Sequence, residues 1–320
     1  MPADKRQHVH VIKDGATAAY GFGAGHPFGA DRHDVFHTEL ASSGVAADVR
    51  FAQARPASRD ELLSFHTSRY IDFVQQACAG GEGFLDGGDT PALPGLYEAA
   101  TAVAGATLNM VDALMTGEAR RAFVPIGGLH HAGRDHAAGF CIFNDCGIAA
   151  EILRRQYGLQ RIAYIDIDAH HGDGMFYAFE QDPDLIIADI HEDGRALYPG
   201  TGSVHETGKG AAVGTKINIP MRPRSGDDRF LQAWDRVEKH LQQYEPEFIL
   251  FQCGADSIAG DPIAHLQFTA DAHAHAARRL CVLADRYSKG RVLGMGGGGY
   301  NRRNLAVAWT AVVREFVAAG

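Results

Sequence analysis

This chain of 320 residues has little of what several protein classes require. Its five cysteines are an odd number without Cys-x-x-Cys spacing, so neither a disulfide framework nor a cysteine zinc site is indicated. No apolar run approaches the length of about 18 residues that spans a bilayer, and the first residues lack the apolar core of a signal peptide. We therefore expect a soluble, cytoplasmic protein of a reducing compartment, without a membrane partner.

Basic residues are also in short supply. Lys and Arg number 30 against 39 Asp and Glu, which gives a net charge of −9 with His neutral. Phosphate binding needs a basic face, so the composition argues against nucleic acid as a direct partner. An acidic surface suits a cationic ligand, such as a lysine-rich peptide or a polyamine.

Apolar runs rich in β-branched residues alternate along the chain with helical patterns. The predicted buried strands are Ala122–Ile126, Ile162–Ile167, Leu185–Ile190, Lys216–Ile219, Phe248–Gln252 and Val292–Met295. The predicted helices include Leu96–Met115, Ile142–Tyr157, Phe230–Tyr244, Thr269–Tyr287 and Asn304–Val317. Ser58 and Glu61 form a capping box before a further helix that runs to Tyr70. This alternation predicts an α/β protein with a mostly parallel sheet covered on both faces, in one domain over residues 1–320.

The most informative segment is Ile165–Gly174, which reads IDIDAHHGDG and closes an apolar strand. Side chains two apart on a strand share a face, so Asp166, Asp168 and His170 point the same way at the strand's carboxyl end. Two carboxylates and an imidazole there need compensation, which a divalent metal supplies. A single Asp or His would be better explained as a loop residue with satisfied hydrogen bonds, but three aligned ligands favour a metal.

Polar residues also follow other predicted strands. Ligands of open parallel sheets gather beyond the carboxyl ends of the strands, where His130, His131 and Asp256 are expected. Asp168, His170 and Asp256 would form an oxygen and nitrogen set that suits zinc, with Fe²⁺ also possible. Three protein ligands leave positions open for water and substrate, which is typical of a catalytic metal site.

Proton transfer at such a site needs a base with a pKa near neutrality. The pair His130 and His131 supplies imidazoles, and Asp166 and Asp173 could each orient one of the rings. Tyr300 follows four glycines and could donate a hydrogen bond to a developing oxyanion. The pattern therefore predicts hydrolysis of an amide by a metal-activated water.

Seven segments in order along the chain closely resemble the zinc-dependent histone deacetylase family, including prokaryotic members related to acetoin utilization proteins. They are HPFGADR (His26–Arg32), HTSRYIDFV (His66–Val74), GGLHHAGRDHAAGFCIFND (Gly127–Asp145), YIDIDAHHGDG (Tyr164–Gly174), LYPGTG (Leu197–Gly202), QCGADSIAGDP (Gln252–Pro262) and GGGGYN (Gly296–Asn301).

The resemblance implies the arginase/deacetylase fold, a single-domain α/β fold with a central, mostly parallel sheet of eight strands. It implies a zinc-dependent amidohydrolase that removes acetyl, or longer acyl, groups from lysine side chains of proteins or peptides. It implies zinc on Asp168, His170 and Asp256. It also implies a structural potassium ion near the zinc strand, held by main-chain oxygens of Asp166, Asp168 and His170.

The same resemblance implies individual roles at the reacting centre. His131 would be the general base and acid, and His130 its electrostatic partner. Asp166 would orient His130, and Asp173 would orient His131. Tyr300 would polarise the scissile carbonyl.

The resemblance further implies a narrow tunnel for an acyl-lysine chain, lined by Gly139, Phe140 and Tyr198. Asp89 matches the rim aspartate that hydrogen-bonds substrate backbone amides. Ile263 stands where a Glu marks polyamine deacetylases, which favours acyl-lysine peptides over acetylpolyamines. The chain has three other departures from the family pattern: Leu129 in place of Trp, Tyr198 in place of Phe, and Asp189 in place of a Ser beside the potassium.

Three alternatives stay open. In the first, the chain deacetylates small acetylated amines such as acetylpolyamines. In the second, it is a weakly active acyl-lysine-binding protein. The third alternative, an arginase-like hydrolase with two metals, would need carboxylate ligands in place of His130 and His131. Four other histidines, His191, His265, His273 and His275, are expected to be structural or surface residues, and Cys141 is expected to be a packed wall residue.

Overall fold

The computed structural model describes residues 8–320 and is built around one eight-stranded sheet. The spatial order is β2-β1-β3-β8-β7-β4-β5-β6, and every neighbouring pair is parallel. The strands are β1 (Val9–Ile12), β2 (Arg50–Ala52), β3 (Arg121–Val124), β4 (Ile162–Asp166), β5 (Leu185–Glu192), β6 (Lys216–Met221), β7 (Phe248–Gln252) and β8 (Val292–Met295). The predicted eight-stranded α/β architecture is confirmed.

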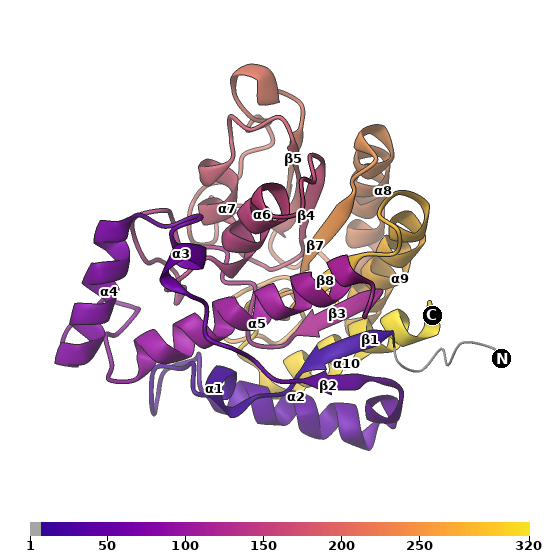
Figure 1. Ribbon diagram of the computed structural model, residues 1–320. Coiled ribbons are helices and arrows are strands. Elements are labelled where there is room, and N and C mark those ends of the chain that lie inside the picture. The colour runs from indigo at the N-terminus through magenta and orange to yellow at the C-terminus, as the bar shows by residue number, and fades with distance from the viewer. Residues whose placement is uncertain (1–7) are drawn as a thin grey trace.

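Helices cover both faces of this sheet, as parallel strands require (Figure 1). They are α1 (Gly15–Ala18), α2 (Asp31–Ser42), α3 (Arg59–Leu62), α4 (Ser68–Gly80), α5 (Leu96–Thr116), α6 (Asp145–Arg155), α7 (Asp173–Ala178), α8 (Asp227–Tyr244), α9 (Ala270–Tyr287) and α10 (Arg302–Ala318). Residues of α4, α5 and α6 form one buried core with one face of the sheet, while α2, α8, α9 and α10 form a second core with the other.

All six predicted strands are present, and β7 and β8 have the predicted bounds. The short edge strands β1 and β2 lie outside those predictions. The capping box of Ser58 and Glu61 is formed, with the Ser58 hydroxyl accepting from Glu61 N. However, the helix that it starts ends at Leu62, and α4 begins separately at Ser68 after its own cap, Thr67. The prediction of one continuous helix to Tyr70 was therefore wrong.

The strand register sets which side chains stand level at the carboxyl edge of the sheet. Asp166, the last residue of β4, lies opposite Gln252 of β7 and Asp189 of β5. Three polar side chains from three strands therefore meet at one height, next to the segment that follows β4.

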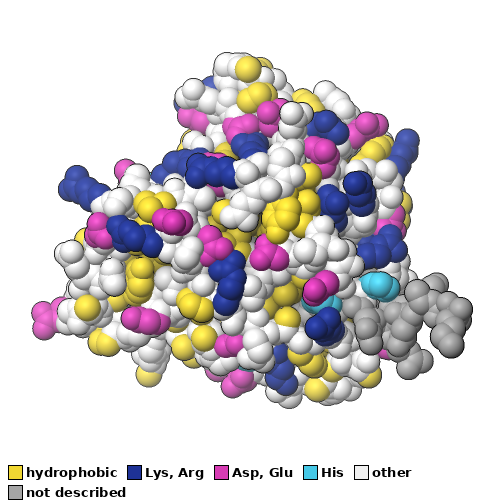
Figure 2. Space-filling view, viewed as in Figure 1, with side chains coloured by type: hydrophobic (Ala, Val, Ile, Leu, Met, Phe, Trp, Pro, Cys, Tyr) yellow, Lys and Arg dark blue, Asp and Glu magenta, His cyan; other side chains and the backbone are white. Residues whose placement is uncertain are grey.

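Two observations concern helix character and surface charge. Among residues 8–320, no helix combines the length and apolar character needed to cross a membrane. On the face shown in Figure 2, Lys and Arg side chains are interspersed with Asp and Glu side chains.

Candidate active site

The segment after β4 is shaped by its own carboxylates. Asp166 Oδ1 accepts a hydrogen bond from Asp168 N at 3.0 Å, and Asp168 Oδ1 accepts one from His170 N at 3.0 Å. Each acid thereby fixes the backbone two residues further on, a local pattern that Asp favours in turns. The alternation that the sequence predicts is thus continued past the end of the strand.

Asp168, His170 and Asp256 are brought together at this edge. Their ligand atoms all lie within 4.8 Å of one another, and the three side chains are buried. His170 Nδ1 is 3.1 Å from Asp168 Oδ1 and 3.2 Å from Asp256 Oδ2. One nitrogen and two carboxylate oxygens are a donor set that zinc accepts, so these residues fit a divalent metal.

The carboxylates of the cluster are held by a second layer. Asp168 Oδ2 accepts from Gln252 Nε2 and from Gly298 N, each at 2.8 Å, and Asp256 Oδ1 accepts from Ala169 N at 2.8 Å. A Cβ on Gly298 would lie 2.0 Å from Asp256 Oδ2, so a side chain there would displace the carboxylate. The cluster therefore depends on a glycine as well as on its ligands.

The electrostatics of the cluster favour a positive charge among its three side chains. Burial and the neighbouring Asp168 raise the pKa of Asp256 to about 7. Burial alone would lower the pKa of His170, but Asp168 and Asp256 raise it to about 10. A proton on His170 thus compensates the two acids, and a divalent cation would take over that part because metal ligands bind deprotonated.

Two Asp–His pairs stand beside the cluster. His130 Nδ1 lies 2.8 Å from Asp166 Oδ2, and His131 Nδ1 lies 2.7 Å from Asp173 Oδ1. The two Nε2 atoms are 3.1 Å apart. The pairs are those that the family resemblance implies.

The two imidazoles have opposite pKa shifts. Burial disfavours a proton on His130, but Asp166 and Asp168 outweigh it and raise its pKa to about 10. Burial and the adjacent His130 lower the pKa of His131 to about 4, against the pull of Asp173. The surroundings therefore favour a proton on His130 and disfavour one on His131.

Two cavities share His131, Gly139, His170 and Tyr300 as lining residues. The first is a chamber of about 10 Å³ lined by His130, His131, Asp168, His170 and Tyr300, with Phe28, Gly128, Leu129, Gly139, Cys141, Gly297 and Gly298. A tunnel of about 210 Å³ is lined by Asp89, His131, Gly139, Phe140, His170, Leu197, Tyr198, Ile263 and Tyr300. Every residue that the sequence assigns to substrate binding lies on this tunnel. Burial, followed by Asp256, raises the pKa of Tyr300 well above its ordinary value, which keeps its hydroxyl protonated.

One tunnel wall has an unusual backbone. Phe140 has a φ of +66°, a left-handed conformation rare for a bulky residue. The Tyr20 hydroxyl donates to Phe140 O at 2.7 Å, and Phe140 N donates to Thr90 Oγ1 at 3.2 Å. Opposite, Tyr198 is 46% exposed. The wall is thus held from behind by hydrogen bonds and leaves an aromatic face open.

Several positioning residues escaped sequence reasoning. Gln252 bonds Asp168, and Asp145 accepts from Gly128 N and Leu129 N at 3.0 and 2.8 Å, which fixes the turn before the two histidines. Buried Arg32 donates to the Gly297 and Gly299 carbonyls of the glycine loop. A polar residue ending an apolar strand was an available signal for Gln252, whereas nothing local identifies Arg32.

Three of the residues that we expect to be structural or surface residues are buried: Cys141, His191 and His273. Cys141 is a buried wall residue, as predicted, and His273 is buried in α9. His191 is fully buried, although a surface loop follows it. His191 Nδ1 lies 2.7 Å from Asp189 Oδ1, and Asp189 Oδ2 accepts from Gly172 N at 2.9 Å. The Asp189 carboxylate is therefore engaged beside the Asp166 strand end.

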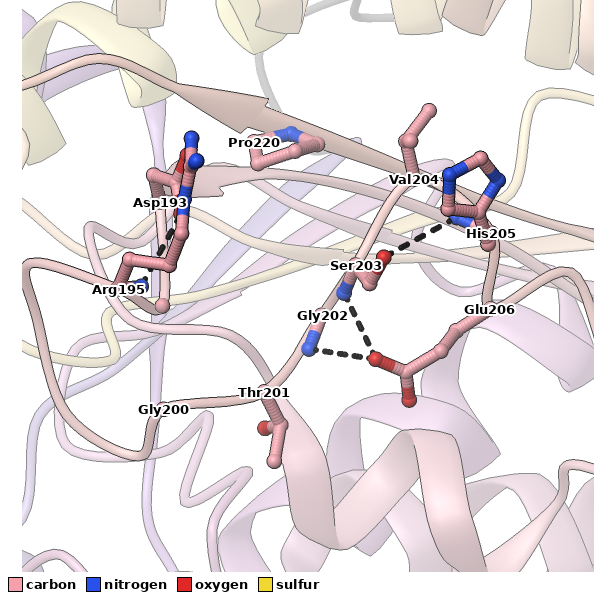
Figure 3. Close-up of a pocket in the computed structure, with 11 residues that line it drawn as sticks. Asp193, Arg195, Gly200, Thr201, Gly202, Ser203, Val204, His205, Glu206 and Pro220 are labelled. Atoms are coloured by element: carbon pink, nitrogen blue, oxygen red, sulfur yellow. Dashed lines mark hydrogen bonds and ion pairs between the residues drawn. The ribbon is translucent and has the colours of Figure 1, made fainter.

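A larger cavity of about 380 Å³ lies on the loop after β5 (Figure 3). Its polar groups are satisfied among themselves, because Arg195 pairs with Asp193 and Glu206 accepts from Gly202 N and Ser203 N. It contains neither a ligand cluster nor either Asp–His pair, so size alone does not identify the reacting centre.

Comparison with known proteins agrees with this geometry. The family profile described as "Histone deacetylase domain" matches residues 26–316. The acetoin utilization protein AcuC of Bacillus subtilis is 38% identical over 305 residues, covering 92% of this chain and 79% of that protein. The histone deacetylase RPD3 of Saccharomyces cerevisiae is 32% identical over 317 residues, covering 96% and 71%. The crystal structure of the HDA15 HD domain superposes with a TM-score of 0.90 at 28% identity, covering 98% of this chain and 89% of that one.

Proposed function

Because the chain belongs to the histone deacetylase family, we propose that it is a zinc-dependent amidohydrolase that removes acetyl groups from lysine side chains of peptides or proteins. The observation that carries the proposal is the cluster of Asp168, His170 and Asp256, whose first two members line the same chamber as His130 and His131. We also propose that residues 1–320 form a single catalytic domain.

The metal would be held by Asp168, His170 and Asp256. When bound, zinc would supply Lewis acidity to a carbonyl oxygen and to water, and Fe²⁺ could serve in its place. A structural potassium ion at the main-chain oxygens of Asp166, Asp168 and His170 is a further proposal that rests on the family resemblance, and Asp189 beside it is a departure from the family pattern.

His131 is the proposed proton acceptor and donor. Its Nδ1 is engaged by Asp173, which fixes the tautomer so that Nε2 is the nitrogen that would take a proton from water and return it to the leaving amine nitrogen. His130 retains its own proton, because Asp166 and Asp168 outweigh burial and raise its pKa to about 10. Its charge would stabilise negative charge that develops in the transition state.

Tyr300 is the proposed donor to the substrate carbonyl oxygen. Its hydroxyl stays protonated because burial and Asp256 raise the pKa. A hydrogen bond that strengthens as the oxyanion forms accelerates the reaction, whereas one made equally to the ground state would not.

The cavity dimensions support a narrow choice of substrate. Phe140 and Tyr198 can enclose an extended methylene chain while Asp89 stands at the rim. The chamber of about 10 Å³ beside Leu129 has room for about one water, which favours acetyl over longer acyl groups. Ile263 places an apolar side chain on the tunnel, so a second ammonium of a polyamine gains no ionic partner from it.

The test is hydrolysis of an acetyl-lysine peptide by the zinc-loaded protein, before and after chelation. We expect activity that disappears with chelator and returns with zinc, and that falls when acetyl is replaced by octanoyl. Acetylputrescine in parallel distinguishes the small-amine alternative, since faster turnover of that substrate would overturn the peptide assignment. Undiminished turnover by the metal-free protein would overturn the metal dependence.

A further inference from the structure

A buried carboxylate outside the metal cluster and both Asp–His pairs contacts two walls of the tunnel. Asp261, which is 8% exposed, follows β7 on the loop that carries Asp256. Its Oδ2 accepts from Tyr300 N at 2.8 Å and from Asn301 N at 3.3 Å, and its Oδ1 accepts from Ile263 N at 3.1 Å. One side chain therefore joins the backbone of Tyr300 to the backbone of Ile263.

Tyr300 needs such an anchor because of what precedes it. Four glycines lead from β8 to Tyr300, and Gly297 and Gly299 have φ of +64° and +119°. A glycine run is conformationally permissive and does not by itself fix the direction of the next side chain. On the other side, the Tyr300 carbonyl accepts from Arg302 Nη1 at 3.1 Å, and Asn301 caps α10. The peptide groups flanking the Tyr300 Cα are thus fixed by polar partners.

The ring of Tyr300 has softer restraints. Its centroid is 5.8 Å from that of Phe140 and 6.5 Å from that of Phe28, both in edge-to-face arrangements. The Arg32 guanidinium carbon lies 5.7 Å from the same centroid. These contacts hold the rotamer of the ring, whereas the backbone anchor sets the position of the Cα from which the ring reaches the chamber.

We propose that Asp261 is a positioning residue for deacetylation, whose carboxylate aims the Tyr300 hydroxyl into the chamber by holding the Tyr300 N–H. The inference rests on the proposed function, in which Tyr300 donates to the substrate carbonyl oxygen. The hydrogen bonds of the Asp261 carboxylate go to the backbone N–H groups of Tyr300, Asn301 and Ile263, so in this proposal it acts through Tyr300. The hydrogen bond from Ile263 N to the same carboxylate links the position of Tyr300 to that of Ile263 on the tunnel wall.

The test is a double-mutant cycle of Asp261→Asn and Tyr300→Phe, with kcat measured on the acetyl-lysine peptide using zinc-loaded protein. Asp261→Asn keeps the size of the side chain but replaces one of the two acceptor oxygens by an NH2 group, which cannot accept. We expect kcat to fall about 10- to 100-fold in Asp261→Asn and ~10²–10³-fold in Tyr300→Phe. The double variant should match Tyr300→Phe within about twofold, because an anchor has no further effect once the hydroxyl is gone.

Asp227→Asn is the matched control. Asp227 is also an aspartate that accepts a backbone N–H, from Thr269 at 2.8 Å, but it joins α8 to α9 away from the tunnel. Its substitution should leave kcat unchanged and should lower the thermal midpoint about as much as Asp261→Asn. Zinc content, measured by mass spectrometry, should be one per chain in all variants.

The outcomes separate the two proposals. If the effects of Asp261→Asn and Tyr300→Phe multiply, or if Asp261→Asn loses zinc, the positioning role is overturned and the proposed function stands. If Tyr300→Phe retains full activity, the proposed chemistry itself is overturned. If Asp261→Asn does not fold, the cycle is run with Asp261→Glu, which moves the carboxylate instead of removing it and should show the same lack of additivity.

Discussion

His130 and His131 are neighbours in the sequence with matching partners, yet their surroundings make them opposites. Each has Nδ1 within 2.8 Å of an aspartate. The pKa of His130 is raised to about 10, whereas that of His131 is lowered to about 4. An aspartate partner therefore does not by itself decide whether a buried histidine is charged.

The difference lies in what surrounds each pair. Asp166 is fully buried, and Asp168 and Asp189 also act on His130, so several carboxylates raise its pKa. Asp173 is 20% exposed at its side chain, and His131 also faces His130, whose positive charge opposes a second proton. A positive charge on His130 disfavours a proton on His131. A neutral ring is the state that a general base requires.

The largest test of this contrast is removal of each ring in turn. His131→Ala should lower kcat/KM by ~10²–10⁴-fold, because a general base is lost. His130→Ala should lower it by about 10- to 100-fold, since it removes charge stabilisation but no proton acceptor. Steady-state kinetics on zinc-loaded variants measures both. A larger loss in His130→Ala would reverse the assignment of roles.

The second test changes the aspartates and leaves the rings in place. Asp173→Asn should lower kcat about 10- to 100-fold, because the amide no longer fixes the tautomer of His131. Asp135→Asn is a matched control, since Asp135 pairs with His136 at 2.8 Å in the open, with both side chains more than half exposed. We expect Asp135→Asn to leave kcat unchanged, and equal losses in the two variants would contradict the orienting role of Asp173.

The third test extends the contrast to His170, the imidazole of the metal cluster. Asp168 and Asp256 outweigh burial and raise the pKa of His170 to about 10. Asp166 and Asp168 have the same effect on His130. Zinc should replace this compensation and stabilise the fold by about 2.7 kcal/mol at a free concentration 100 times its Kd. Calorimetry should show the thermal midpoint rising by several degrees with zinc in the parent protein. It should not rise in Asp256→Ala, and an equal rise there would place the metal elsewhere.

The smallest expected effect concerns His37, a buried histidine of α2. Burial, followed by His33 and Lys13, lowers the pKa of His37 to about 3. The unfolded chain binds this proton near pH 6.5 and the folded chain does not, so stability falls as pH drops from about 6.5 towards 3. Urea unfolding at pH 7 and pH 5 should show this loss, and His37→Phe should reduce it. An unchanged slope in His37→Phe would assign the acid sensitivity to other groups.

Sequence reasoning succeeded where the signal was local. The strands β7 and β8 are continuous apolar runs, and the alternation of Asp166, Asp168 and His170 follows from the geometry of a single strand. It failed for α2, whose buried positions include Arg32, His33 and His37, so that apolar periodicity is weak. It also missed β2, which has three residues and two exposed positions.

Contacts between distant loops account for the rest. The bonds from Asp261 to Tyr300 and from Tyr20 to Phe140 join residues 39 and 120 positions apart. No pattern within either segment announces such a bond, because it exists only once the sheet has brought the loops together. The resemblance placed Tyr300 and Phe140 at the site but gave no indication of what holds them.

The left-handed backbone of Phe140 also makes this position a natural point of divergence. Glycine and asparagine adopt such a conformation more readily than phenylalanine, so either replacement would recover some of the stability lost with the ring. A single substitution at residue 140 would therefore widen the tunnel entrance. This makes residue 140 the first position to randomise in a search for variants that accept bulkier substrates.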